Sequence, residues 1–329
     1  WVQFQQSLEQ HGYMLRPRYH SGWIASWIGT KKHPANCEKW HCCGVTKCVD
    51  AVRISNNRQV MIKAVWAQNL KEVEIGQYLS SSDLASEPGN HCVPILDIFK
   101  VPYSDLELII MPLLRKVDGP PFRTVGEAVA LFKRLFEGIQ FMHKNHVAQV
   151  CVIILMDASE MLPEEFHPTS TMLARDSGTL KIKHYTRTER PPKYYLIDFG
   201  LSRKYNPEDG IPSEMRILGA ADWPYKFIAT KPSNPYLVDV YFMVKLVDDM
   251  RQDDPAKRPT IDEVVTRFDG IIRSLSSFKL RSPLIEPEAH PSGFKLWKGA
   301  IDYGVHLLFR ELPNYLRRLP AIISGPGKI

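Results

Sequence analysis

Apolar and polar residues alternate along the first third of the chain in short stretches that predict β-strands. Residues 49–54 and 59–65 alternate in this way, and the turn residues between them (Ser-Asn-Asn) predict a hairpin. Two further apolar stretches, residues 91–99 and 106–114, are typical of strands as well. Pro112 lies in the last stretch. Because proline cannot donate a ladder hydrogen bond, we expect the strand to give way to a connector there.

Two other stretches have the spacing of helices. Residues 69–79 carry apolar side chains at roughly helical intervals. Residues 124–143 form the clearest helix, with Thr124 as its N-cap and Glu127 three positions later, the pair that makes a capping box. The apolar positions of this helix form one wide stripe, which predicts that it belongs to the core: Val125, Ala128, Val129, Phe132, Leu135, Phe136, Ile139 and Met142.

A carboxylate stands at the end of a predicted buried strand. Residues 194–197 (Tyr-Tyr-Leu-Ile) lead directly into Asp198, and an acid in such a place is costly unless it meets a metal or a lysine. Lys63, near the middle of the strand 59–65, is a candidate partner, although a lysine there could also face solvent. Glu72 or Glu74 of the helix 69–79 could pair with Lys63 or remain solvated. Glu72 is preferred because residues three and seven positions later lie on the buried side.

Several motifs occur in the order and spacing of the protein-kinase signature set. They are residues 60–63 (Val-Met-Ile-Lys), 198–200 (Asp-Phe-Gly), 234–241 and 253–265. Over about residues 10–282 the chain therefore resembles a eukaryotic-type protein kinase domain. The amino-acid sequences of three other segments are especially similar to those of the kinase-like proteins expanded in mushroom-forming (basidiomycete) fungi: residues 12–19, 91–96 and 275–281.

The resemblance implies a two-lobed α+β fold. An antiparallel sheet with one helix would occupy residues 49–113, and a mainly helical lobe, shortened relative to that of the family, would occupy residues 114–282. Residues 1–48 would be an irregular extension, and residues 283–329 a tail.

The resemblance also implies a nucleotide site. Lys63, held by Glu72, would orient the phosphates of ATP, and Asp198 would hold Mg²⁺. Met111 and Leu113, in the connector between the lobes, would face the purine. In an intact relative, the phosphoryl group would be transferred to a serine or threonine hydroxyl.

The catalytic loop of that family, His-Arg-Asp-x-x-x-x-Asn, is missing. Gln149, Val150 and Cys151 stand in its place, and a few residues are absent after them. A cysteine is a poor substitute for the catalytic aspartate, because its thiol is mostly protonated near neutral pH and offers no oxygen to Mg²⁺. No catalytic residue of the loop is therefore intact.

Other parts of the pattern depart as well. No glycine-rich loop that would cover phosphates precedes residue 49. Residues 223–225 (Trp-Pro-Tyr) stand where a glutamate is expected to pair with Arg258. Part of the helical lobe after Asp239 is also missing.

Two functions follow from these departures. One is a kinase-like protein that keeps part of an ATP and Mg²⁺ site but transfers phosphate slowly or not at all, since loss of a proton-accepting group costs about 10²–10⁴-fold in rate. The alternative is an active Ser/Thr protein kinase whose catalytic loop and part of whose helical lobe were lost from this gene model. The protein substrate or binding partner stays undefined.

Composition changes this picture little. The net charge of +6 and the pI of about 8.9 come from scattered residues, so no nucleic-acid site is predicted. No apolar run approaches the roughly 18 residues of a membrane span, and no secretory signal is visible, which favours a cytoplasmic or nuclear protein. Cys37, Cys42, Cys43 and Cys48 lie close together, but their spacing is not that of usual zinc sites, and reduced thiols are preferred.

The last segment has one amphipathic stretch. Its apolar residues share one helical face, and three arginines add positive charge nearby: Trp297, Ile301, Val305, Leu308 and Leu312, with Arg310, Arg317 and Arg318. We expect this stretch to dock on the helical lobe. A membrane-surface or partner-binding helix is the alternative.

Overall fold

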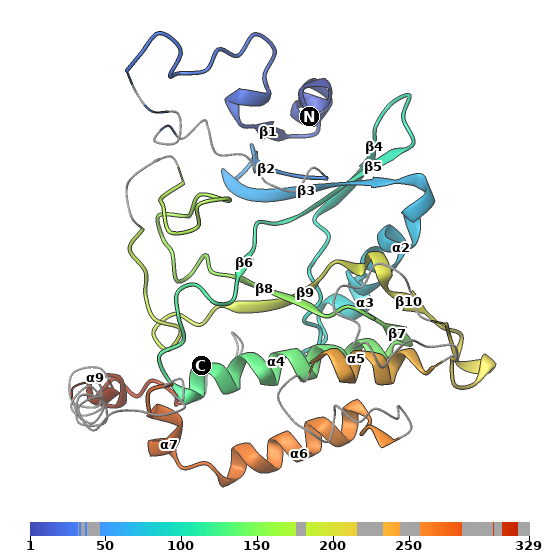
Figure 1. Ribbon diagram of the computed structural model, residues 1–329, viewed down its shortest axis with the longest axis vertical. Helices are drawn as coiled ribbons and strands as arrows, with labels where there is room; N and C mark the ends of the chain where they lie inside the picture. The colour runs from blue at the N-terminus through green and yellow to red at the C-terminus, as the bar shows by residue number, and fades with distance from the viewer. Residues whose placement is uncertain are drawn as a thin grey trace.

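The computed structural model describes residues 1–31, 33, 37, 47–175, 182–215, 233–243, 257–284, 305 and 311–321. Its fold is mixed α/β, with a curled antiparallel sheet above a set of helices (Figure 1). Residues 223–225, Cys42 and Cys43, and most of the amphipathic tail stretch lie outside the described residues.

Five antiparallel strands form the main sheet in the spatial order β1-β2-β3-β5-β4. They are β1 (Tyr13–Leu15), β2 (Cys48–Arg53), β3 (Arg58–Trp66), β5 (Leu106–Pro112) and β4 (Asp97–Lys100). β3 lies in the middle of the sheet and pairs with a strand on each side, so that Lys63 stands opposite Cys48 of β2 and Ile109 of β5. Because β3 is paired with a strand on each side, the backbone that carries Lys63 is held in place.

One face of the sheet is covered by the start of the chain. Helix α1 (Gln5–Gln10) places Leu8 in a cluster with apolar residues of all five strands: Tyr13, Leu15, Val49, Ala51, Val60, Ile62, Phe99, Leu106, Leu108 and Ile110. The expectation of an irregular extension over residues 1–48 is therefore wrong for its first part. β1 pairs with β2 from Tyr13 opposite Arg53 to Leu15 opposite Ala51, and it completes the sheet.

The other face of the sheet receives helix α2 (Leu70–Leu79), which follows β3 through the short 3-10 turn Ala67–Asn69. Val73 of α2 packs with Val65 of β3 and Ile109 of β5. Glu72 is buried, whereas Glu74 is exposed, in agreement with the preference for Glu72 as the partner of Lys63. The one-turn helix α3 (Ser82–Ala85) comes next.

Two strand predictions need correction. Residues 91–96 do not form a regular strand with 97–99. They run beside β9 instead, where Val93 N donates to the carbonyl of Leu196 at 2.9 Å. The connector was expected to begin at Pro112, but Pro112 is the last residue of β5 and stands opposite Val60. Proline is tolerated at a strand end because its carbonyl oxygen still accepts a hydrogen bond.

Below the sheet, helix α4 (Val125–Lys144) is the axis on which the other elements pack (Figure 1). Short strands cover it from above: β6 (Arg115–Lys116), β8 (Ile153–Asp157) and β9 (Lys193–Ile197) in one sheet, and β7 (Val147–Ala148) with β10 (Arg203–Lys204) in another. Helices α5 (Pro235–Met243), α6 (Ile261–Ser274), α7 (Ser277–Arg281) and α9 (Leu312–Leu316) complete the described part. Short 3-10 turns lie at Val2–Phe4, Pro17–Tyr19, Phe199–Leu201 and Pro207–Asp209.

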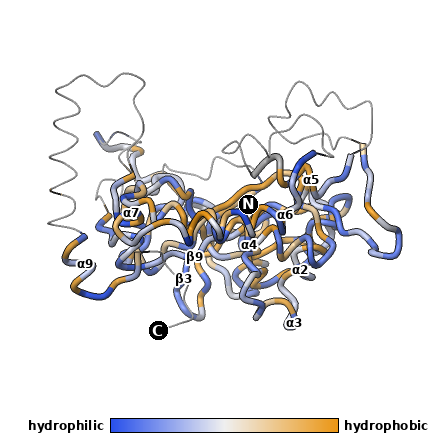
Figure 2. Tube along the Cα trace, turned by 90° about the horizontal axis from the view of Figure 1, so that it is seen from below, coloured by the Kyte–Doolittle hydropathy of each residue, from blue (hydrophilic) through white to orange (hydrophobic). Residues whose placement is uncertain are grey.

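The main core cluster joins the sheet side to the helical side. It contains Ile75 and Leu79 of α2, Leu196 and Phe199 at the end of β9, and Ile139 of α4, all buried. In Figure 2, hydrophobic and hydrophilic positions alternate along most of the described helices and strands, as expected of elements with one inward and one outward face. None of the described helices combines the length and the apolar character that crossing a bilayer requires.

The cap of α4 forms only half of the predicted capping box. The hydroxyl of Thr124 accepts a hydrogen bond from Glu127 N at 3.2 Å, as expected. The Glu127 carboxylate, however, accepts from Arg123 N at 2.7 Å and from Thr188 N and Oγ1 at 3.1 and 3.0 Å. One carboxylate oxygen thus reaches back to Arg123 N instead of Thr124 N, and the other makes a tertiary contact with Thr188.

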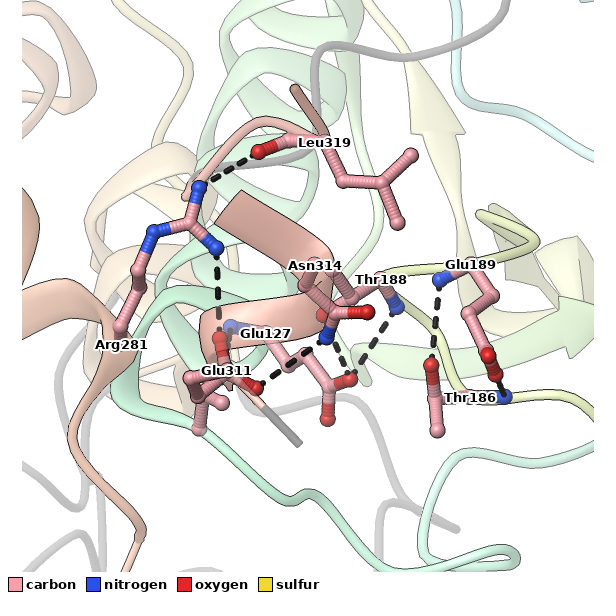
Figure 3. A network of polar contacts seen from close by, with 9 residues as sticks. Glu127, Thr186, Thr188, Glu189, Arg281, Glu311, Asn314 and Leu319 are labelled. Carbon is pink, nitrogen blue, oxygen red and sulfur yellow. Dashed lines mark hydrogen bonds and ion pairs between the residues drawn. The ribbon is translucent and has the colours of Figure 1, made fainter. Parts of the chain in front are cut away.

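The end of the described chain docks beside this cap, as Figure 3 shows. Arg281 of α7 forms an ion pair with the buried Glu311 at 3.2 Å and donates to the carbonyl of Leu319. Asn314 is buried and donates to Glu311 at 3.3 Å. Residues 311–321 are therefore docked on the helical part. The apolar face predicted for the amphipathic stretch is not tested by these contacts, because most of it lies outside the described residues and its described members, Val305 and Leu312, are exposed.

Candidate functional site

The three charged residues that the sequence singled out come together below the main sheet. Lys63 Nζ of β3 contacts Glu72 Oε1 of α2 and lies 2.8 Å from Asp198 Oδ1, directly after β9. Asp198 therefore meets a lysine, one of the two partners that its place at the end of a buried strand requires. We call these three residues the charged triad.

The three side chains of the triad differ in their exposure to solvent. The side chains of Glu72 and Lys63 are 11% and 18% exposed, whereas that of Asp198 is 47% exposed. Burial of the ammonium by itself lowers the pKa of Lys63. The charges of Glu72 and Asp198, together with their hydrogen bonds, raise it more, so the pKa of Lys63 lies above its ordinary value. Lys63 is thus a fixed positive charge, with one acid behind it and one on the solvent side.

The backbone after β9 aims Asp198 at Lys63. Asp198 has φ of 63° and ψ of 74°, in the left-handed region that side-chain-bearing residues rarely adopt. The next residue, Phe199, is 3% exposed and packs in the main core cluster. A Cβ on Gly200 would lie 3.3 Å from Glu72 Oε2 and 3.4 Å from Asp198 Oδ1. A strained aspartate held by a buried phenylalanine is typical of a functional turn.

Met111 and Leu113 do not join the triad. Met111 stands opposite Met61 in the sheet and is half-buried. Leu113 is buried in a second cluster with Leu131 and Met156, against which Met61 also packs. Met111 thus packs against the core clusters, and nothing in the structure tests a contact of either residue with a purine.

A buried carboxylate, that of Asp239 in α5, organises the turn at residues 149–151. Asp239 is fully buried. It accepts hydrogen bonds from Gln149 N at 2.8 Å, from Val150 N and from His143 Nε2 at 2.9 Å. Val150 has φ of 67°, so the chain turns sharply around this carboxylate. Its three donors come from positions about 90 residues earlier, so no local pattern in the sequence indicates them.

Gln149 links this turn to the strand that carries the triad. Its Nε2 donates to the carbonyl of Ile197, the residue before Asp198, at 2.8 Å. Gln149 is fully buried, and its Oε1 has no hydrogen-bond donor within the part of the chain that the structure describes. Gln149 is thus a positioning residue for Asp198 that sequence reasoning missed, because a glutamine between Ala148 and Val150 carries no local signal.

Cys151 lies next to this turn and is half-buried. Burial raises the pKa of its thiol, and the negative charges of Asp198 and Asp239 raise it further. The thiol is therefore protonated at neutral pH and cannot accept a proton from a hydroxyl group. This agrees with the expectation that Cys151 does not replace a catalytic aspartate.

The sequence left the partner of Arg258 open, and residues 223–225 lie outside the described residues. Arg258 is buried, and its Nη1 donates to the carbonyl of Leu237 in α5 at 3.3 Å. The following helix α6 begins with a complete capping box between Thr260 and Glu263. This region therefore anchors α6 to α5.

Among the described residues, no group of three or more histidine, cysteine, aspartate or glutamate side chains could hold a metal ion by itself. Mg²⁺ usually binds proteins through one or two carboxylates, with water and substrate phosphates completing its shell. The half-exposed carboxylate of Asp198 fits that more limited role. Asp198 would be the protein ligand of a magnesium ion that arrives with a phosphate-bearing molecule.

Comparison with models of known protein families gives no match for this chain, and comparison with curated proteins gives no significant match either. The chemical interpretation therefore rests on the geometry. A buried lysine fixed by a glutamate can bind an anionic oxygen, and a half-exposed aspartate can hold a hard cation next to it. Together they suit a polyphosphate, whose anionic oxygens would pair with the lysine and whose bound cation would pair with the aspartate.

Proposed function

We propose that this protein is a nucleotide-binding member of the protein-kinase-like proteins, with a two-lobed fold and impaired phosphoryl transfer. The observation that carries the proposal is the convergence of Lys63, Glu72 and Asp198, which lie far apart in the sequence, on one place below the sheet. The strand order β1-β2-β3-β5-β4, with α2 inserted between β3 and β4, supports the same proposal.

In this proposal each residue of the triad has a distinct role. The Lys63 ammonium binds phosphate oxygens of ATP, and Glu72 keeps it pointed at them. Asp198 would hold Mg²⁺, which supplies charge neutralisation for the phosphates when bound. Gln149 restrains the backbone at Ile197 and so fixes the direction of Asp198.

In this proposal the protein transfers phosphoryl groups slowly, because it has no proton acceptor at position 151. No carboxylate stands at Cys151, and the protonated thiol there cannot take up the proton of an attacking hydroxyl. A protein with this site would bind ATP and act through its surfaces or change shape on binding. Slow transfer without a base remains about 10²–10⁴-fold below that of a complete site.

Calorimetry with ATP and Mg²⁺ on the full chain, combined with a phosphate-transfer assay, tests the proposal. Lys63→Met should weaken ATP binding at least about tenfold, the equivalent of about 1.4 kcal/mol. Lys100→Met is the matched control, since the Lys100 side chain is 82% exposed on β4. Its ATP affinity should equal that of the unchanged protein.

The possible outcomes separate the alternatives. Binding without turnover supports an impaired kinase-like protein. Turnover that Asp198→Asn abolishes would instead favour an active Ser/Thr kinase. If ATP with Mg²⁺ does not bind to the folded protein at all, the proposal fails.

A further inference from the structure

Residues 158–175, here called the strap, follow β8 and rise from the helical part to the main sheet (Figure 1, yellow-green). The strap is well packed. Four of its apolar side chains are buried in the cluster of Leu113 and Met156, against which Met61 of β3 also packs: Ala158, Met161, Leu162 and Phe166. A segment with this much buried apolar surface has one defined position.

The first link between strap and sheet is at the tip of the β2–β3 hairpin. Arg175 Nη1 donates to the carbonyl of Asn57 at 3.2 Å, and Nη2 lies 3.5 Å from Asn57 Oδ1. Glu165, also in the strap, holds Arg175 through an ion pair of 2.6 Å. Asn57 has φ of 55°, so the carbonyl that Arg175 reaches belongs to the turn itself.

The second link is at the other side of β2. His167 Nε2 lies 2.9 Å from Arg16 Nη1, directly after β1, and Arg16 also forms an ion pair with Asp50 of β2. His167 and Asp50 are both buried. The His167 ring is fixed from its other side, where its Nδ1 lies 3.0 Å from Thr169 Oγ1. The strap therefore holds the first two strands and the hairpin at separate points.

A cavity of about 400 Å³ lies between the strap and the hairpin. Its walls are the hairpin (Arg53, Asn56, Arg58, Gln59 and Val60), the chain at Pro112 and Leu113, and the strap from Ser159 to Phe166 together with Asp157. This volume is within the range of small-molecule sites. One wall is the strap and another is the hairpin, so the contact of Arg175 with Asn57, next to Asn56 of the lining, joins two walls of the cavity. The His167 link lies outside the lining and holds the same two segments together from β2.

We propose that the strap is a latch: its contacts through Arg175 and His167 hold the hairpin over this cavity, and their release opens the cavity to a nucleotide. The nucleotide part rests on the proposed function, because Leu113 in the cavity wall is one of the residues that the resemblance assigns to purine contact. The mechanical part rests only on the contacts described above.

Hydrogen exchange on the full chain without ligand tests the mechanical part. In Arg175→Gln, the amides of residues 54–60 should exchange roughly tenfold faster, which corresponds to about 1.4 kcal/mol. The amides of Ile62 and Leu108 in the centre of the sheet should not change. Arg190→Gln is the matched control, because Arg190 follows the strap and pairs with Glu160 at 3.8 Å instead of reaching the sheet.

Unchanged exchange at the hairpin in Arg175→Gln would overturn the latch, and so would an equal increase over the whole sheet. If that variant does not fold, Glu165→Gln carries the same expectation, since it removes the carboxylate that orients Arg175.

The rate of association of a fluorescent ATP analogue with Mg²⁺ tests the second part. It should rise several-fold in Arg175→Gln and stay constant in Arg190→Gln, and an equal rate in both variants would overturn the gating. If no variant binds the analogue, the proposed function fails, whereas the exchange result still decides the latch.

Discussion

Lys63 shows how one residue depends on its neighbours. It is held by the buried Glu72 and the more exposed Asp198, so removal of its charge leaves one carboxylate buried without a cation. Lys63→Met should lower the free energy of unfolding by up to about 3–5 kcal/mol, the range measured when a buried ion pair loses one partner. Chemical denaturation measures this loss. The double variant Lys63→Met/Glu72→Gln should recover part of it, and a purely additive result would contradict the coupling.

The raised pKa of Lys63 also predicts a pH dependence. Because the folded pKa lies above the unfolded value of about 10.4, the stabilisation is fully present below that pH and is lost as pH rises through the folded pKa. Denaturation between pH 8 and 12, roughly the range that brackets the unfolded pKa, should show a steeper alkaline loss in the unchanged protein than in Lys63→Met. Parallel curves would show that the charge of Lys63 does not contribute.

Asp239 is the corresponding residue on the helical side. Asp239→Asn keeps the shape but turns one of its acceptor oxygens into a donor, which then faces a donor of Gln149, Val150 or His143. We expect a loss of about 1–3 kcal/mol for the unsatisfied buried group. Thermal unfolding measures the loss, and exchange at residues 147–150 should rise more than in α6. A neutral effect would mean that this turn is held by other contacts.

At the scale of the element, helix α6 depends on the hydrogen bonds that cap its N-terminus. Thr260 accepts a hydrogen bond from Glu263 N, and the Glu263 carboxylate accepts from Thr260 N at 2.7 Å. Thr260→Ala should therefore cost about 0.5–2 kcal/mol, the usual value of an N-cap.

Thr266→Ala on the same helix is the control for the cap. The Thr266 hydroxyl donates only to the Asp262 carbonyl in the helix interior at 2.8 Å, and such back-bonding slightly destabilises helices. Its removal should be neutral or stabilising in urea denaturation. Equal losses in both variants would rule out a special role for the cap.

At the scale of the whole molecule, the end of the described chain closes on the start of α4 (Figure 3). A Cβ on Gly126 would lie 1.9 Å from the Ala321 carbonyl oxygen, a distance that no structure tolerates. Gly126→Ala should therefore displace residues 311–321 and expose Glu311 and Asn314. Limited proteolysis should cut this segment much faster than in the unchanged protein.

Gly270→Ala in α6 separates this steric effect from the general effect of replacing a helical glycine. Nothing lies within 4 Å of a Cβ at Gly270. This change should stabilise the protein by about 0.5–1 kcal/mol and leave the proteolysis pattern as it is. Protection of residues 311–321 in Gly126→Ala would contradict the docked arrangement.

The sequence by itself determined the elements whose evidence is local. The helix over residues 124–143, the Thr124 cap and the apolar run before Asp198 each depend on neighbours within a few positions, and the structure has all three. The predicted stripe is correct from Leu135 onward, whereas Val125, Ala128, Val129 and Phe132 are only half-buried. The preference for Glu72 over Glu74 came from helical spacing as well. Even the pairing of Lys63 with acids could be anticipated, because a buried charge requires an opposite one.

Only the tertiary structure decided what depends on distant partners. The pairing of β1 with β2, the place of Pro112 in β5 and the contact of Glu127 with Thr188 all contradict or extend local expectations. The strap and the donors of Asp239 gave no sequence signal, since their partners lie roughly 90 to 150 residues away. Local patterns fix which segments become helices and strands, whereas burial and hydrogen bonding between remote segments fix where they meet.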